Sequence, residues 1–317
     1  MMQFPKRSKI FLPVTILILV SVWRISSGEW DISFPDVIRF LLTDSNSPEA
    51  VVIRSVRLPR VVCSIFAGGI LSVSGVILQG LLSNPLAEPY TLGIASGAAL
   101  GAAVGILGGT WAVMPCAFGG AIFALALTFA IARNGGRERL ILSGVISNAV
   151  LSAGVTFLKS IAGDKIGAVV LWLMGSFSGA GWNDARVVIF GAVIVSLPAY
   201  VMGNSLDAMS LGGERASALG VNEKFVRGVL LVCASIGVAL CVSAFGVIGF
   251  VGLIVPHISR GFVGANHRRV TVNAFVIGGL MMTVADGAAQ RFGEIPAGVI
   301  TALTGGPFFC WVLSGKR

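Results

Sequence analysis

The chain has 317 residues, of which 55% are apolar and only 12% carry a charged side chain. Soluble domains have roughly 25% charged residues, so this composition excludes an ordinary soluble protein and indicates a membrane protein. The net charge of +9 does not indicate a nucleic-acid partner, because membrane proteins concentrate Lys and Arg in their cytoplasmic loops.

Long runs without Asp, Glu, Lys or Arg predict the membrane-spanning helices, since a hydrocarbon core about 30 Å thick requires about 20 apolar helical residues. A turn at Gly108–Thr110 divides one long run, and Gly246, Gly249 and Gly252 divide another. The sequence therefore predicts an all-α polytopic membrane protein with about ten transmembrane helices. In chain order they lie at about 10–27, 61–82, 91–108, 112–132, 140–158, 187–206, 228–245, 247–259, 270–286 and 296–314.

The first span has an alternative interpretation. Lys6, Arg7 and Lys9 precede its apolar run, and the small residues at 26–28 follow it. This order of charged, apolar and small residues is also typical of a signal peptide. Cleavage would leave an odd number of spans and would make the segment after Gly28 the mature N-terminus.

Residues 166–183 are also free of charge, but four glycines interrupt them, which favours a surface or re-entrant segment over a regular helix. With ten spans and both termini in the cytoplasm, 14 of the 23 Lys and Arg residues lie on the cytoplasmic side. If 166–183 crossed the membrane, only eight would lie there, against the rule that cytoplasmic loops are rich in Lys and Arg. We therefore expect ten spans.

Gly97, Gly101 and Gly105 recur at every fourth position, so they share one helix face and allow a neighbouring backbone to approach closely.

The five cysteines lie singly in apolar runs, as small core residues do. Two histidines are too few for a metal site of imidazoles. We expect His257 to cap a short helix and His267 to lie in a loop.

Catalytic signals are missing from the sequence. It has no phosphate-binding G-x-x-x-x-G-K-[S/T] loop, so ATP-driven activity would need the ATP site of another subunit. Carboxylates near the spans are few and lie at span ends, as Glu88, Asp286 and Glu294 do, which makes a proton-coupled carrier the less favoured class.

The segment 211–221 predicts a short amphipathic helix with Leu211, Leu219 and Val221 on one side and Glu214 and Arg215 exposed; an ordinary loop is the alternative.

Five motifs occur in one order along the chain. They are RLPR at 57–60, GLLSNPLAEPYTLG at 80–93, LGGERASALGV at 211–221, GVIGFVGLIVPHISR at 246–260 and EIPAGVITALTGGPFF at 294–309. Together they resemble the iron-siderophore, haem and cobalamin permease family of ABC importers. The resemblance implies a type II ABC importer permease fold in a single transmembrane domain over 1–317, with the core bundle at about 57–314. A short sequence similarity between LSGVIS at 142–147 and PAGVIT at 296–301 is consistent with two loosely related halves.

The resemblance also implies a function and a set of partners. The chain would be the permease subunit of a bacterial inner-membrane importer that translocates an iron chelate, a ferric siderophore, with haem or cobalamin as alternatives. It would pair with a second permease subunit, identical or related, and with two cytoplasmic ATPase subunits that use ATP-Mg. A periplasmic binding protein would deliver the substrate. No covalently bound cofactor, metal site or catalytic residue is expected.

The resemblance assigns roles to residues at three places. Coupling to the ATPase is expected at Leu211, Gly212, Glu214, Arg215, Leu219 and Gly220. Docking of the binding protein is expected at Arg57 and Arg60, and at Arg291, because Gln290 occupies the position of the usual third arginine. A cytoplasmic gate is expected at Asn84, Pro85 and Leu86. The segment 137–139 carries charges where the family often has small polar residues, so no role is assigned to it.

Overall fold

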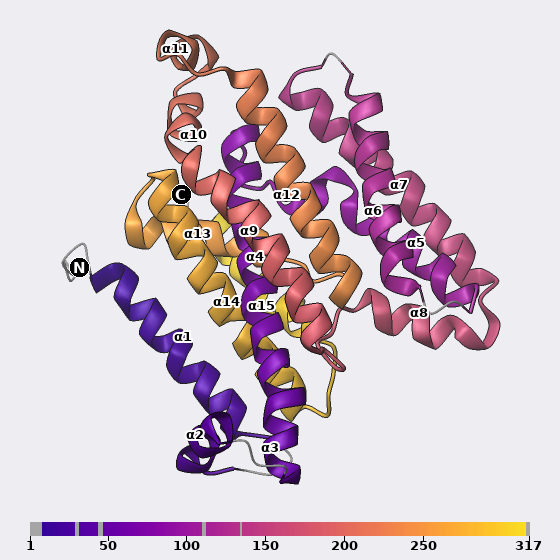
Figure 1. Ribbon diagram of the computed structural model, residues 1–317. Coiled ribbons are helices and arrows are strands. Elements are labelled where there is room, and N and C mark those ends of the chain that lie inside the picture. The colour runs from indigo at the N-terminus through magenta and orange to yellow at the C-terminus, as the bar shows by residue number, and fades with distance from the viewer. Residues whose placement is uncertain (1–7, 29–31, 44–46, 110–111, 134, 315–317) are drawn as a thin grey trace.

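The computed structural model describes residues 8–28, 32–43, 47–109, 112–133 and 135–314, and throughout these ranges it is helical without strands. Figure 1 shows the helices gathered in one bundle. Their bounds are α1 Ser8–Ser26, α2 Phe34–Leu42, α3 Pro48–Val52, the π-helix η1 Ile53–Arg57, α4 Leu58–Leu82, the 3-10 helix η2 Pro89–Leu92, α5 Ile94–Leu107, α6 Val113–Ile131, α7 Arg137–Ser160, η3 Gly163–Lys165, α8 Ile166–Leu173, α9 Trp182–Val201, α10 Gly203–Ser210, α11 Gly213–Ala218, α12 Glu223–Phe245, α13 Val251–Val263, α14 His267–Arg291 and α15 Ala297–Ser314.

The prediction of an all-α polytopic membrane protein is confirmed. Six segments of the described chain are long and apolar enough to cross a membrane: Pro48–Leu82, Val113–Ile131, Arg137–Ser160, Trp182–Val201, Glu223–Phe245 and His267–Arg291. Four shorter apolar helices lie at Phe11–Ser26, Ile94–Leu107, Val251–Val263 and Ala297–Cys310. These ten segments occupy the positions of the ten predicted spans. Lys6, Arg7 and Thr110, named in the sequence predictions, lie outside the described residues.

The segment predicted not to span forms α8, whose eight residues are too few to cross a bilayer. The next helix was placed wrongly at 187–206: α9 begins at Trp182 and ends at Val201, and α10 follows as a separate helix. Asp184 accepts a hydrogen bond from the backbone N–H of Gly181 at 2.9 Å. A capping carboxylate belongs to the first turn of a helix, so a search for charge-free runs starts this helix too late.

Helix α4 is the centre of the bundle, and almost every residue from Pro59 to Leu82 is buried. Glycines allow its neighbours to approach its backbone. A Cβ atom on Gly75 would lie 1.9 Å from the carbonyl oxygen of Gly252 in α13, and one on Gly68 would lie 2.1 Å from that of Gly278 in α14. Small residues at helix contacts are typical of membrane bundles, where van der Waals packing drives association.

The backbone between α12 and α13 leaves the helical conformation at Gly246, which has a φ of 75°. Gly252 was predicted to take part in this break, and that prediction was wrong, because Gly252 lies inside α13. The hydroxyl of Tyr90 donates to the carbonyl of Ile248 at 2.8 Å and accepts from the N–H of Ile248 at 3.1 Å. Ser176 donates its N–H to the carbonyl of Phe245 at 2.8 Å. Non-helical backbone at membrane depth requires such partners.

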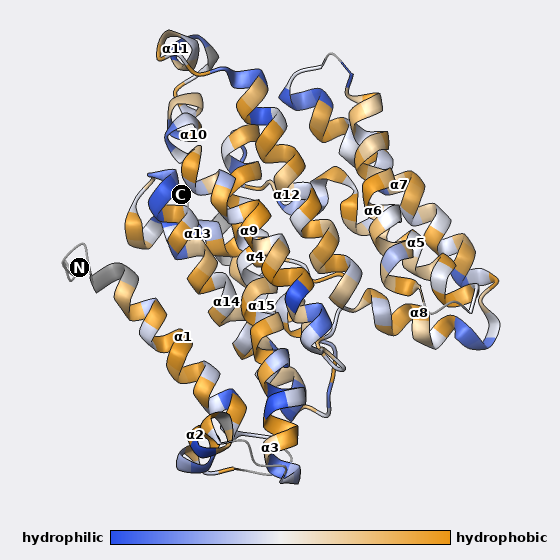
Figure 2. Cartoon of the chain, in the orientation of Figure 1, coloured by the Kyte–Doolittle hydropathy of each residue, from blue (hydrophilic) through white to orange (hydrophobic). Residues whose placement is uncertain are grey.

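The bundle has two ends with different content (Figure 1). The α11 end holds α11, the turn after α4 and the link between α6 and α7. The α2 end holds α2, α3 and the link between α14 and α15. Hydrophilic residues gather at these two ends, at the link between α7 and α8 and at the start of α9, and apolar residues cover most of the helices between them (Figure 2). This separation is the one expected when successive spans alternate in direction across a membrane. Helices α2 and α3 were not predicted within the segment before Arg54.

Candidate functional site

The predicted amphipathic segment 211–221 contains the short helix α11, so the helical prediction was right for Gly213–Ala218. Glu214 and Arg215 are exposed, as predicted. Leu211 and Leu219 are also exposed, at 58% and 66%, whereas Ala216 is fully buried. The segment therefore presents two charges and two large apolar side chains at its surface. This combination suits a protein partner, because large exposed apolar groups are costly in water.

The end of α11 is joined to α12 through a hydrogen-bonded turn. The N–H of Gly220 donates to the carbonyl of Ser217 at 2.9 Å, and that of Val221 donates to Ala216 at 3.0 Å. Gly220 has a φ of 77°, so these bonds form a Schellman motif, which favours glycine at this position. Asn222 then caps α12 by accepting from the N–H of Phe225 at 3.1 Å. Helices α11 and α12 are therefore connected by a short segment that is hydrogen-bonded at both of its ends.

The predicted gate residues lie in the turn that follows α4, at the α11 end. Helix α4 ends at Leu82, and Ser83 adopts a left-handed conformation with a φ of 48°. The side-chain oxygen of Asn84 accepts from the N–H of Leu86 at 2.9 Å, which closes a tight turn of the Asx type. Pro85 and Leu86 are exposed. The turn is thus held by its own hydrogen bonds and projects from the bundle.

Arg137, to which no role was assigned, connects this turn with two helices. Its Nη1 donates to the hydroxyl of Ser83 at 2.6 Å, and its Nη2 lies 3.9 Å from a carboxylate oxygen of Glu223. Glu223 also forms an ion pair with Arg227 one turn along α12. Arg137 therefore links the end of α4, the start of α7 and the start of α12. The sequence carried no signal for this link, because its members are far apart in the chain.

A buried cluster of charges lies at the α2 end. Asp286 of α14 accepts from Arg60 of α4 at 2.9 Å and from Arg24 of α1 at 2.8 Å. Arg60 also donates to both carboxylate oxygens of Glu294, at 3.0 and 2.8 Å. Asp286 is 1% exposed and Arg24 is 5% exposed. Two arginines and two carboxylates balance one another, and the pair Arg24–Asp286 gives α1 a structural place in the bundle.

The three arginines predicted to dock a binding protein all lie at the α2 end, but their environments differ. Arg60 is 9% exposed, and its Nε, Nη1 and Nη2 donate to the two carboxylates of the cluster. Arg57 donates to the backbone carbonyls of Ile25 and Ser26 at 2.9 and 3.1 Å. Arg291 is exposed, and its guanidinium lies 4.8 Å from the ring centroid of Trp23. Of the three, Arg291 is the most accessible to another protein.

Glu294 is the accessible member of the cluster, since its side chain is 45% exposed. The hydrogen bonds from Arg60 hold the pKa of Glu294 below its usual range, against the opposing effect of burial. Its backbone has a φ of 59°, a conformation that is uncommon outside glycine. The contact with Arg60 therefore fixes both the charge and the position of this side chain.

The pH dependence of stability tests this ion pair. A carboxylate with a lowered pKa stabilises the fold above its unfolded pKa of about 4.3, and the contribution is lost as pH falls through the folded-state value. Because Glu294 is half exposed, we expect Glu294→Gln to cost at most about 1 kcal/mol at neutral pH. The difference from wild type should shrink as pH falls below about 4.3 and vanish only below the lowered folded-state pKa of Glu294. Thermal unfolding in detergent at several pH values measures this, with Glu138→Gln as control. A difference that persists unchanged at low pH would contradict the ionic origin.

Metal-binding clusters are not found: among the described residues, no group of three His, Cys, Asp or Glu could hold an ion. The cysteines of this part of the chain are free. Cys63 and Cys241 are buried as expected, Cys116 and Cys233 are partly buried, and the prediction was wrong for Cys310, which is exposed. Both histidine predictions were wrong. His257 lies inside α13, and His267 is the buried first residue of α14, where its Nδ1 lies 2.5 Å from Asp207. This contact joins α14 to α10.

Comparisons with known proteins agree with this architecture. A model described as the FecCD transport family matches residues 16–315. A hemin transport system permease of Yersinia pestis is 34% identical and matches over 95% of this chain and 94% of that protein. An Fe(3+)-citrate import system permease of Bacillus subtilis is also 34% identical, over 96% and 94%.

A solved structure described as an inward-facing conformation of a metal-chelate type ABC transporter matches with a TM-score of 0.87 and 31% sequence identity. It covers 99% of this chain and 100% of its own. The chain belongs to the FecCD transport family and is a membrane-spanning permease of the ABC importer class.

Proposed function

We propose that this permease imports an iron chelate of the ferric siderophore type and is driven by two separate ATPase subunits that hydrolyse ATP-Mg. The importer class for iron chelates, haem or cobalamin follows from the family. Two relatives named for ferric citrate and hemin favour an iron-containing substrate, with cobalamin as the alternative. The observation that carries the proposal is the exposed helix α11, which a short hydrogen-bonded turn connects to the spanning helix α12.

The α11 end is the cytoplasmic end in this proposal. Described basic residues gather there, on α7, α11, α12, the start of α14 and the links beside them, and cytoplasmic segments are enriched in Lys and Arg. They include Arg133, Arg137, Arg139, Arg215, Lys224, Arg227, Arg268 and Arg269. Both termini then lie in the cytoplasm of a bacterial inner-membrane protein. The ATPase pair contacts α11, and a second permease subunit completes the translocation path.

Movement of α11 reaches the gate by a short route. When the ATPase subunits close on Glu214 and Arg215, the Schellman motif and the cap at Asn222 pass the displacement to α12. Glu223 at the start of α12 then pulls or releases Arg137, which holds the turn after α4 through Ser83. The exposed residues Pro85 and Leu86 of that turn form the cytoplasmic gate. The gate thus responds to α11 without any ATP site in this chain.

The α2 end receives the periplasmic binding protein. Arg291 and Arg57 are the first contacts, because Arg60 is occupied by Asp286 and Glu294. An acidic side chain of the binding protein reaches Arg60 only by replacing the half-exposed Glu294. Charge pairs at an interface rim act mainly on the association rate, so docking here should weaken as salt rises.

Charge reversal on α11 tests the proposed coupling. We expect Glu214→Arg/Arg215→Glu to abolish most ATP-dependent uptake of a ferric siderophore by the reconstituted importer, with the permease still folded. The swap Glu138→Arg/Arg139→Glu alters two exposed charges at the same end and is the matched control. Equal uptake by the two swapped permeases would remove α11 from the coupling route. Parallel uptake assays with haem and cobalamin decide the substrate.

The Arg137 link gives a second expectation. Replacing Arg137 with alanine removes its contacts with Ser83 and Glu223, so ATP hydrolysis should continue while substrate uptake per ATP falls several-fold. Arg139→Ala serves as control, because Arg139 is exposed two residues away. The measurement is the ratio of transported siderophore to released phosphate in proteoliposomes. An unchanged ratio in Arg137→Ala would show that the turn moves independently of α12.

A further inference from the structure

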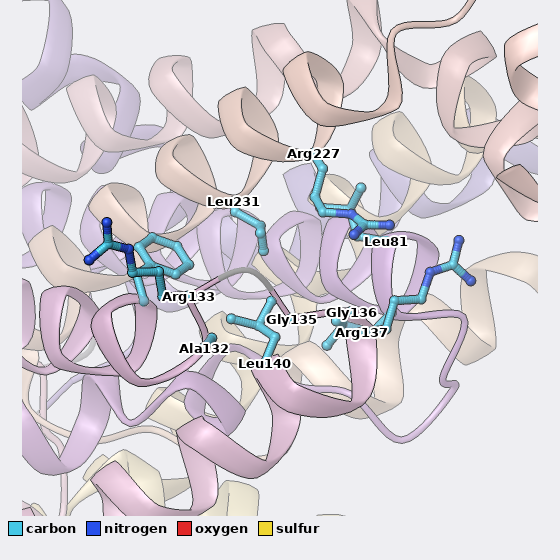
Figure 3. A pocket seen from close by; sticks show the side chains of 11 residues that line it. Leu81, Ala132, Arg133, Gly135, Gly136, Arg137, Leu140, Arg227 and Leu231 are labelled. Carbon is cyan, nitrogen blue, oxygen red and sulfur yellow. The ribbon is translucent and has the colours of Figure 1, made fainter.

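Two adjoining cavities lie at the α11 end between α6, the start of α7 and α12. The first has a volume of about 220 Å³ and is shown in Figure 3. The second has a volume of about 380 Å³ and extends along α12. They share Phe129, Arg227 and Leu231 as lining residues. The two cavities therefore form one groove with a common wall on α12, which we call the α6–α12 groove.

The outer part of the α6–α12 groove is strongly basic. Arg133 follows α6, Arg137 begins α7, and Lys224 and Arg227 lie in the first turns of α12. Figure 3 shows Arg133, Arg137 and Arg227 arranged around the first cavity. Glu223 is the carboxylate of this groove, and it forms ion pairs with Arg137 and Arg227. Four cations thus face one anion.

Two of these cations lack an anionic partner within the described residues, and one buried donor atom of a third cation lacks a hydrogen bond there. Arg133 and Lys224 have no carboxylate partner within the described part of the chain. The Nε of Arg227 is buried there without a hydrogen-bond partner. An unsatisfied buried donor on a cation is costly, and an anionic ligand would remove that cost. The basic end of the groove therefore carries an excess of positive charge that an anionic ligand would neutralise.

The inner part of the same groove is apolar. Phe129 and Leu231 line both cavities, and Val232, which is 43% exposed, lines the second. A surface that is cationic at the membrane boundary and apolar towards the bilayer has the polarity of a phospholipid with a negative headgroup.

We infer that the α6–α12 groove binds one anionic phospholipid. The phosphate lies among Arg133, Lys224 and Arg227, and an acyl chain lies along Phe129, Leu231 and Val232. Basic pockets between transmembrane helices are known to suit acidic lipid headgroups. The site concerns the lipid environment of the permease and does not depend on which substrate is carried.

The test measures lipid binding directly. The purified full-length permease is titrated in detergent with phosphatidylglycerol or phosphatidylcholine of the same acyl chains, and bound lipid is counted by native mass spectrometry. We expect one tight phosphatidylglycerol, with binding weakened roughly tenfold or more in Arg133→Ala/Lys224→Ala, since each basic residue near an acidic headgroup adds appreciably to affinity. Both residues are exposed, so the double variant should remain folded. Arg139→Ala, an exposed arginine outside the groove, should bind as the wild type does.

Two outcomes would overturn the inference. Equal binding of phosphatidylglycerol by the wild type and the double variant would show that the groove is not the site. Competition by inorganic phosphate or glycerol phosphate at equal concentration would show that a soluble anion, and not a lipid, is the ligand. Neither outcome bears on ATP-dependent uptake, so the lipid site and the transport function are tested separately.

Discussion

Asp286→Ala is expected to destabilise the permease by about 3–5 kcal/mol, the cost of breaking a buried ion pair by removing one partner. Asp286 is 1% exposed and accepts hydrogen bonds from both Arg24 and Arg60. Without it, Arg24 keeps only the neutral side chain of Gln290 as a hydrogen-bond partner within the described residues, at 2.7 Å. A buried arginine without an anion is then the source of the instability.

Thermal unfolding in detergent measures this effect in a background where Cys116, Cys233 and Cys310 are replaced by serine, because the buried thiols of Cys63 and Cys241 then react with a maleimide dye only after the bundle opens. Asp164→Ala removes an exposed aspartate and is the matched control. If the unpaired cation causes the loss, the double variant Arg24→Met/Asp286→Ala should recover part of it. Equal unfolding temperatures for Asp286→Ala and Asp164→Ala would show that the cluster contributes no stability.

Gly101→Leu is expected to separate α5 from α6. A Cβ atom at Gly101 would lie 2.0 Å from the carbonyl oxygen of Cys116, and one at Gly97 would lie 2.3 Å from that of Gly120. Both obstacles are backbone atoms, so they cannot move without displacing a helix. Overpacking of a core costs about 1–3 kcal/mol or more, and lipid offers no hydrophobic force to press the helices together again.

The same thiol assay ranks a series of variants at this contact. Gly101→Ala should already lower the unfolding temperature, and Gly101→Leu should lower it further or prevent the purification of folded protein. Gly119→Ala is the control, since no atom lies within 4 Å of a Cβ at that position of α6. A Gly101→Ala permease as stable as Gly119→Ala would contradict the close helix contact.

Periodicity predicted this contact correctly, because glycines four residues apart share a helix face whatever the tertiary structure is. Charge-free runs also located the spanning helices, since membrane insertion tolerates few charges. The same criterion failed at α9, where Asp184 and Arg186 lie in the first turns of the helix. It also missed α2, whose nine residues include Asp36 and Arg39.

Interactions between distant residues could not be predicted from one sequence. Arg24 ends an apolar run that also fitted a signal peptide, and its partner Asp286 lies 262 residues away. The motif at 57–60 singled out Arg60 as a docking residue, but its burial against Asp286 and Glu294 depends on how α4 packs on α14. Likewise, Arg137 meets Ser83 only because α6 returns the chain to the α11 end. Such contacts follow from packing and not from local pattern.

The central claim is that transport by this permease is powered by ATP hydrolysis on a partner. The most direct measurement is uptake of a ⁵⁵Fe-labelled ferric siderophore by proteoliposomes that contain the permease, its ATPase subunits and its binding protein, with an uncoupler present to collapse proton gradients. We predict uptake that requires ATP and the ATPase subunits and is unaffected by the uncoupler. Uptake by the permease alone, driven by an imposed pH gradient and abolished by the uncoupler, would contradict this account.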